Sequence, residues 1–158
     1  MQNEYYPEEN ELFLIEKWDT SDVINLLSYI EERWWSADWG FNMKWGKDHI
    51  HNTRPVIYLE LHTGGWSGNE SLIYALLNNQ MFNIMWYSQW NRGGHFRFEI
   101  NPYQVGYKTA NELAKEKKVT RQAIHKSKDY DRIQVSDRLI LFRPKPSRLR
   151  QQPLSEGA

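Results

Sequence analysis

The stretch LHTGGWSGNESL, from Leu61 to Leu72, joins a strand-like run to a helix-like run through three glycines and a tryptophan. Before it, PVIYLEL (55–61) alternates apolar residues with polar or amphipathic ones, which predicts a strand. After it, NESLIYALLNN (69–79) repeats apolar residues at helical spacing. The sequence therefore predicts a strand–turn–helix unit, with a tight turn made by the adjacent glycines.

Two interpretations of this turn stay open. A strand, glycines and then a helix start is the layout of many anion sites, because helix N-terminal amides attract phosphate or carboxylate. The stretch contains neither GxGxxG nor a Walker A motif, however. Ser67 followed by Glu70 matches a capping box. A purely structural turn therefore explains every residue except Trp66.

The surrounding sequence predicts a small Trp-rich α+β domain over residues 1–106, with helices packed on one face of a sheet. All eight tryptophans lie within its first 90 residues. The predicted elements are a short strand in 11–18, a helix over 20–35 capped by Thr20 or Ser21, a long loop over 36–54, and a hairpin formed by 83–90 and 95–100 around NRGG.

Polar side chains gather on one face of the predicted sheet. Glu60 and His62 lie opposite the core, and His95, Arg97 and Glu99 share their face if the hairpin joins the same sheet. Such a face, rimmed by tryptophan, suits an anionic aromatic ligand such as a nucleotide; a solvated face without a ligand is the alternative. The candidate ligand- or partner-binding residues, for an anionic small molecule or a host protein held by residues 36–100, are Trp66, Ser67, His62, Arg92, His95 and Arg97.

Composition indicates a soluble, cytoplasmic protein with two modules. The 158 residues include no cysteine, no signal-peptide pattern and no apolar run near the roughly 20 residues that span a bilayer, so no membrane partner is expected. The net charge of zero divides unevenly. Residues 1–106 hold 7 Lys+Arg against 14 Asp+Glu, and residues 107–158 hold 13 against 6. The basic module is the one suited to nucleic acid.

The basic module carries helix-start signals at a close spacing. Thr109 and Glu112 form a predicted capping box, and Thr120 is placed to cap a second helix against which Ala123 and Ile124 pack back. The stretch YKTANELAKEKKVTRQAIHKSKDYDRIQVSDRLILFRPK resembles a compact winged helix-turn-helix of the phage-regulator and excisionase type. The resemblance implies such a module over 107–143, followed by a basic, disordered tail over 144–158.

That resemblance implies DNA as the partner of residues 107–150. A recognition helix over 120–127 exposes side chains suited to the major groove, and the wing and tail add cations that can follow phosphates. The candidate DNA-binding residues are Arg121, Gln122, His125 and Lys126 on the helix, and Arg138, Arg143, Lys145, Arg148 and Arg150 beyond it.

Two motifs of the first module carry a second resemblance. TGGWSGNE (63–70) and RGGH (92–95) resemble motifs of small uncharacterised phage and prophage proteins. This resemblance implies a phage origin but no agreed activity. The expected function is a phage-derived DNA-binding regulator of transcription. The alternative is an anti-defence protein, an anti-CRISPR or a nucleotide-sequestering inhibitor, that binds its target through the Trp-rich domain.

Catalytic motifs are absent from the sequence. GWSGN lacks the second glycine of GxSxG, and the histidines, including His49 and His51, show no HExxH spacing. A zinc or metal-hydrolase site formed by His49, His51, His62 and His95 is the alternative. Without a supporting motif we expect no catalytic residues, no metal and no cofactor.

Overall fold

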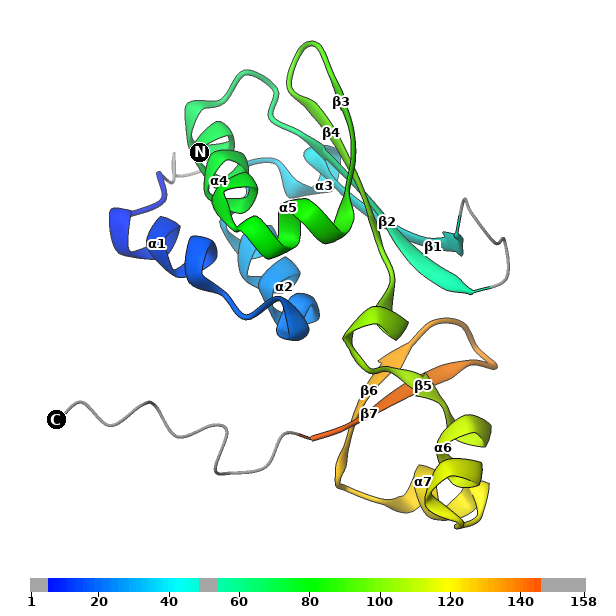
Figure 1. Cartoon of the computed structure of the whole chain (residues 1–158). Coiled ribbons are helices and arrows are strands. Elements are labelled where there is room, and N and C mark those ends of the chain that lie inside the picture. Colours follow the sequence, from blue (N-terminus) through cyan, green and yellow to red (C-terminus); the bar gives the residue numbers. More distant parts are fainter. Residues whose placement is uncertain (1–5, 49–53, 146–158) are drawn as a thin grey trace, which may run out of the picture. The chain divides into compact units, whose positions relative to one another are not determined.

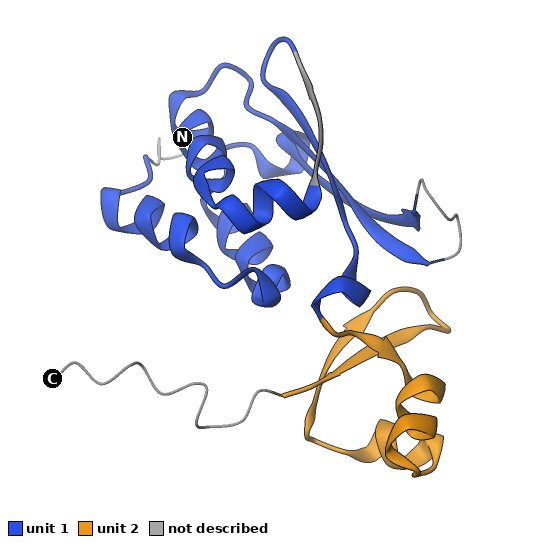
Figure 2. Cartoon of the chain, in the orientation of Figure 1, with its two compact units in different colours: residues 1–105 blue, residues 106–158 orange. Residues whose placement is uncertain are grey.

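The computed structural model describes residues 6–48 and 54–145, with backbone alone over 87–91. The chain forms two compact units, Met1–Val105 (unit 1) and Gly106–Ala158 (unit 2), each of which combines helices with an antiparallel sheet (Figure 2). The predicted α+β class is confirmed. The boundary lies one residue before the predicted one. His49, His51 and the tail from residue 146, with Arg148 and Arg150, lie outside the described residues.

Unit 1 is a four-stranded sheet, in the order β1-β2-β4-β3, with helices on one face (Figure 1). Its helices are α1 (Glu9–Lys17), α2 (Val23–Arg33), α3 (Ala37–Gly40), α4 (Ser67–Asn78) and α5 (Gln80–Trp86), with 3-10 turns η1 (Thr20–Asp22) and η2 (Pro102–Val105). Its strands are β1 (Phe41–Lys47), β2 (Pro55–His62), β3 (Tyr87–Asn91) and β4 (His95–Ile100).

The core lies between this sheet and helices α1, α2, α4 and α5. Ile57, Leu59 and Leu61 of β2 are at most 1% exposed, as the alternation predicts. They pair directly with Ile100, Phe98 and Phe96 of β4, so both strands direct apolar side chains to the same face. The alternate residues of both strands form the opposite face of the sheet.

Two expectations for the first 54 residues are wrong. Residues 11–17 belong to helix α1, with Trp18 as its C-cap, and no strand forms there. Leu12, Ile15 and Trp18 recur every third residue and meet the core on one side. The predicted loop over 36–54 contains α3 and the edge strand β1. Strand β1 is largely exposed and reads as polar; its full-length pairing with β2 makes it a strand.

The hairpin and the helix caps need smaller corrections. Residues 83–86 end helix α5, with Phe82 and Trp86 buried one turn apart, so only the part from Tyr87 is strand. The predicted capping box at Ser67 does not form, since Trp66 is the N-cap of α4 and makes no side-chain cap bond. Asp19 caps the 3-10 turn η1, where its carboxylate accepts from the Ser21 amide. The N-cap of α2 is Asp22, so neither Thr20 nor Ser21 is the cap.

Unit 2 has the element order of a winged helix-turn-helix (Figure 1). Two short helices are followed by a hairpin, and a short first strand completes a sheet in the order β5-β7-β6. The elements are β5 (Lys108–Thr109), α6 (Ala110–Lys117), α7 (Arg121–Lys126), β6 (Tyr130–Gln134) and β7 (Ile140–Pro144). Leu113, Ile124 and Phe142 form the core with Ala110, whereas Ala123 is exposed and does not pack back as predicted.

Candidate functional site

The two helices of unit 2 are fixed by local capping. Thr109 accepts from the Glu112 amide, and the Glu112 carboxylate accepts from the Thr109 amide, so the predicted capping box is present. Thr120 caps α7 by accepting from the Ala123 amide at 3.1 Å. Lys118, at the turn, has φ 57° and occupies the left-handed position where glycine is common. These bonds set the direction of α7 relative to α6.

Helix α7 presents a polar, basic surface. Arg121, Gln122 and Lys126 are exposed, as predicted for a recognition helix. His125 differs, because its ring packs edge-on against Phe142 with centroids 5.1 Å apart. The end of the helix is held by Arg132, whose guanidinium donates to the His125 and Ser127 carbonyls at 2.6 and 2.8 Å.

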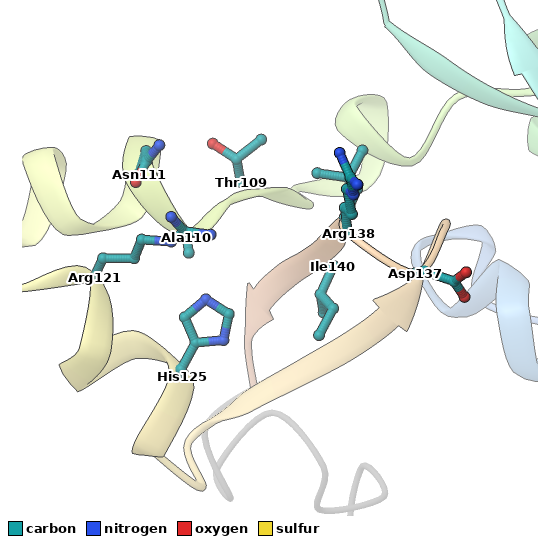
Figure 3. A pocket seen from close by; sticks show the side chains of 9 residues that line it. Thr109, Ala110, Asn111, Arg121, His125, Asp137, Arg138 and Ile140 are labelled. Carbon is teal, nitrogen blue, oxygen red and sulfur yellow. The ribbon is translucent and has the colours of Figure 1, made fainter.

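A pocket of about 310 Å³ lies between α7, the N-terminal end of α6 and the β6–β7 turn (Figure 3). Arg121 and His125 enter it from α7, and Arg138 enters it from the turn. The remaining lining residues are Thr109, Ala110, Asn111, Asp137, Leu139 and Ile140. The structure thus brings three of the predicted DNA-binding residues to one hollow. Thr109 and Asn111 were not identified from the sequence, although the capping box at Thr109 marked this helix end.

The other predicted wing cations differ in availability. Lys145 is exposed. The Arg143 side chain is only 15% exposed, forms an ion pair with Asp131 at 3.4 Å and lies over the Tyr107 ring at 4.5 Å. Arg143 therefore stabilises its own sheet and is a poor candidate for a phosphate contact.

The outer face of the sheet in unit 1 brings His62, His95 and Arg97 together. His62 and His95 are directly opposed on β2 and β4, and their Nδ1 atoms lie 2.5 Å apart. In the next pair along, Arg97 Nε lies 3.5 Å from the Glu60 carboxylate. The predicted polar face exists, and it includes an ion pair and a histidine pair.

The two sequence motifs of unit 1 meet at this end of the sheet. The Thr63 amide donates to the Gly94 carbonyl at 3.0 Å. A Cβ at Gly94, where φ is 78°, would lie 2.2 Å from Thr63 Oγ1. Both observations explain why glycine is needed there. Thr63 and Gly94 thus join the two motifs for a structural reason, and this contact adds nothing to the anion-site interpretation.

The remaining candidates of unit 1 lie at the start of α4 and at the β3–β4 turn. Trp66 is stacked on Trp35 with ring centroids 5.2 Å apart and also contacts Tyr6. Ser67 is the first residue of α4, and Arg92 is exposed at the β3–β4 turn. Their ligand- or partner-binding role stays a prediction.

Acid should destabilise unit 1 through His62. Burial lowers the pKa of His62 below its ordinary value; the charges of His95 and Arg97 lower this pKa further, and the Glu60 carboxylate opposes them. Below pH about 6.5 the unfolded chain therefore binds more protons at His62 than the folded chain does. As the pH is lowered from there, the free energy of unfolding decreases until the pH passes the pKa of His62 in the folded protein.

Urea unfolding at pH 7.5 and pH 5.5 tests this. Tryptophan fluorescence reports unit 1 alone, because every tryptophan lies in it. We expect His62→Asn to lose less stability than the wild type between these two pH values. An equal loss in both proteins would contradict the assignment to His62.

Within the described ranges, no three or more His, Cys, Asp or Glu side chains converge as a metal-binding group. In the same part of the chain, none of the helices has the length and apolar character to cross a membrane. No protein-family model matches this chain, and neither a curated protein nor a solved structure is significantly similar to it. Its function is therefore inferred from the geometry and charge of these surfaces.

Proposed function

We propose that the protein binds double-stranded DNA through unit 2 and acts as a regulator, with unit 1 as a partner- or ligand-binding module. A phage origin, as the sequence resemblances imply, is part of this proposal. Helix α7 would enter the major groove, where Arg121 pairs with guanine and Gln122 with adenine, while Arg138 and Lys145 contact phosphates.

The observation that carries the proposal is the arrangement around the pocket. Arg121 on α7 and Arg138 on the β6–β7 turn lie on one hollow although 17 positions separate them in the sequence. In a winged helix-turn-helix, the recognition helix and the wing present cations to the same duplex. One arginine from each of these two elements beside a single hollow supports such a role. Unit 2 holds 13 Lys+Arg against 6 Asp+Glu, so its long-range field favours a polyanion.

The two units differ in a way that supports this division of roles. Unit 1 holds 7 Lys+Arg against 14 Asp+Glu, so it gains little from a phosphate backbone. Its outer sheet face carries an ion pair and a histidine pair instead of a run of cations. DNA binding is therefore assigned to unit 2 alone.

A salt titration of the full chain tests the proposal. Binding to a fluorescently labelled 30-base-pair duplex of mixed sequence is measured by anisotropy between 50 and 300 mM salt. Lys126, Arg138 and Lys145 are exposed, and three phosphate contacts give a slope of log K against log salt of about −3. Absence of binding at 50 mM salt, or a flat slope, would overturn the assignment.

A further inference from the structure

The histidine pair of unit 1 has a geometry that a solvated sheet face does not require. The Nδ1 atoms of His62 and His95 face each other at 2.5 Å, with the ring planes inclined by 69°. Two ring nitrogens that face each other cannot both direct a lone pair at the other, so this arrangement suits a proton or a cation between them. With a proton there, one ring donates and the other accepts.

The far side of His62 lies near a carboxylate. Its Nε2 is 4.0 Å from the Glu60 carboxylate, and that carboxylate forms an ion pair with Arg97 at 3.5 Å. The negative charge of Glu60 favours a proton on Nε2, which leaves Nδ1, the atom that faces His95, as the lone-pair donor. A small rotation of either side chain would bring Glu60 to hydrogen-bond distance, the usual support of a metal-ligating histidine.

The space around the pair allows additional ligands. The His62 side chain is 21% exposed, and Trp39, itself 55% exposed, covers one side with its ring centroid 5.8 Å away. On the His95 side the nearest chain is the glycine turn, where a Cβ at Gly93 would lie 3.5 Å from His95 Nε2. His95 is half-buried, so part of its side chain is in contact with solvent.

The distances suit a transition-metal ion after a small movement. Zinc–nitrogen bonds of about 2.0–2.1 Å at angles between 90° and 109° place two ligand nitrogens about 2.9–3.4 Å apart. The rings would have to part by less than 1 Å, which side-chain rotation on two adjacent strands can supply. His95 would exchange its Nδ1 proton for one on Nε2 through solvent.

We propose that His62 and His95 form a binding site for a divalent transition-metal ion of the class that prefers imidazole, with Glu60 as the positioning carboxylate behind His62. The protein supplies two nitrogen ligands, and water completes the coordination sphere. Imidazole ligands select Zn²⁺ and Cu²⁺, with Cu²⁺ bound more tightly, over Mg²⁺ and Ca²⁺, which prefer oxygen. The open coordination positions would give unit 1 a place for an exogenous anionic ligand.

Isothermal titration of the full chain with Zn²⁺ at pH 7.5 tests the site. His49 and His51 are replaced by asparagine in every protein compared, so that only the described histidines remain. We expect one Zn²⁺ per chain, and a loss of affinity of at least tenfold in His62→Asn and in His95→Asn. His125→Asn, which removes a lone histidine of unit 2, should bind as the parent does.

The supporting carboxylate provides a matched pair of variants. Glu60→Gln should lower Zn²⁺ affinity about tenfold, as loss of a carboxylate behind a ligating histidine does elsewhere. Glu99 lies on the same sheet face, four residues along β4 from His95, and Glu99→Gln should leave the Zn²⁺ affinity unchanged. Cu²⁺ should also quench Trp39 fluorescence, and Trp39→Phe should remove that part of the quenching.

Any of three results would overturn the proposal. The first is no saturable Zn²⁺ binding up to 1 mM in a protein whose near-ultraviolet circular dichroism shows that unit 1 is folded. The second is Zn²⁺ binding that survives unchanged in both His62→Asn and His95→Asn. The third is competition by Mg²⁺ at a concentration equal to that of Zn²⁺.

Discussion

Replacement of Asn69 by leucine is expected to lower the free energy of unfolding of unit 1 by about 3–5 kcal/mol. Asn69 is 1% exposed in the first turn of α4. Its side-chain oxygen accepts from the Trp35 amide at 2.8 Å, and its nitrogen donates to the Trp35 and Thr63 carbonyls at 3.0 and 3.4 Å. Leucine fills a similar volume but leaves the half-buried amide and carbonyl of Trp35 without these partners, each at a cost of about 1–3 kcal/mol, whereas the Thr63 carbonyl still accepts from the Trp66 amide.

Urea unfolding followed by tryptophan fluorescence measures this loss. The control is Asn78→Leu, at an exposed position of the same helix whose side chain makes a 3.4 Å bond to Glu16. The control should change stability by no more than about 0.5 kcal/mol. If the two leucine variants unfold at similar urea concentrations, the hydrogen bonds of Asn69 to Trp35 and Thr63 do not stabilise unit 1 as expected.

Asn69 also shows why the TGGWSGNE motif was only partly interpretable from the sequence. Its glycines and the helix after them follow local rules, so the turn was predictable. The bonds of Asn69 reach Trp35, 34 positions earlier, and no local pattern announces such a contact. The capping-box expectation failed at the same place, because α4 begins at Ser67 itself and not one residue after it.

Strand β1 illustrates a second limit of the sequence. FNMKWGK has two lysines, an asparagine and a glycine, so its own pattern favours a loop. It becomes a strand because Phe41 to Lys47 pair one for one with β2, whose apolar residues were recognisable. An edge strand with one partner and little burial owes its structure to that neighbour more than to its own residues.

The candidate sites divide in the same way. The two helices of unit 2 could be predicted because each begins with a threonine that caps the amide three residues further on, and this is a local sequence signal. Arg121 and Arg138 line the same pocket because strands β5, β6 and β7 form one sheet. The alternation in β2 and β4 placed His62 and His95 on one face, but their direct opposition needed the register. The sequence thus identified the candidate residues, whereas the distances between their side chains required the folded structure.

Replacement of Arg121 by alanine is expected to weaken DNA binding by about 1–3 kcal/mol, roughly 5- to 150-fold in Kd at constant salt. Arg121 lies in the first turn of α7, exposed, at the pocket shared with Arg138. The N-terminal residues of a recognition helix contact base edges. Loss of the Arg121 side chain therefore removes a bidentate donor as well as a charge. Anisotropy titration with the same labelled duplex measures the change.

Two further variants separate the contributions of charge and geometry. Lys128→Ala removes one positive charge from an exposed position outside the pocket, and should reduce affinity far less than Arg121→Ala does. Arg121→Lys keeps the charge but not the planar fork. If Arg121→Lys restores most of the lost affinity, Arg121 contacts phosphate; if it restores little and discrimination among duplex sequences is lost, Arg121 contacts a base. Equal affinities for Arg121→Ala, Lys128→Ala and the parent would show that Arg121 does not contact the duplex, and would contradict its assignment as a base-reading residue.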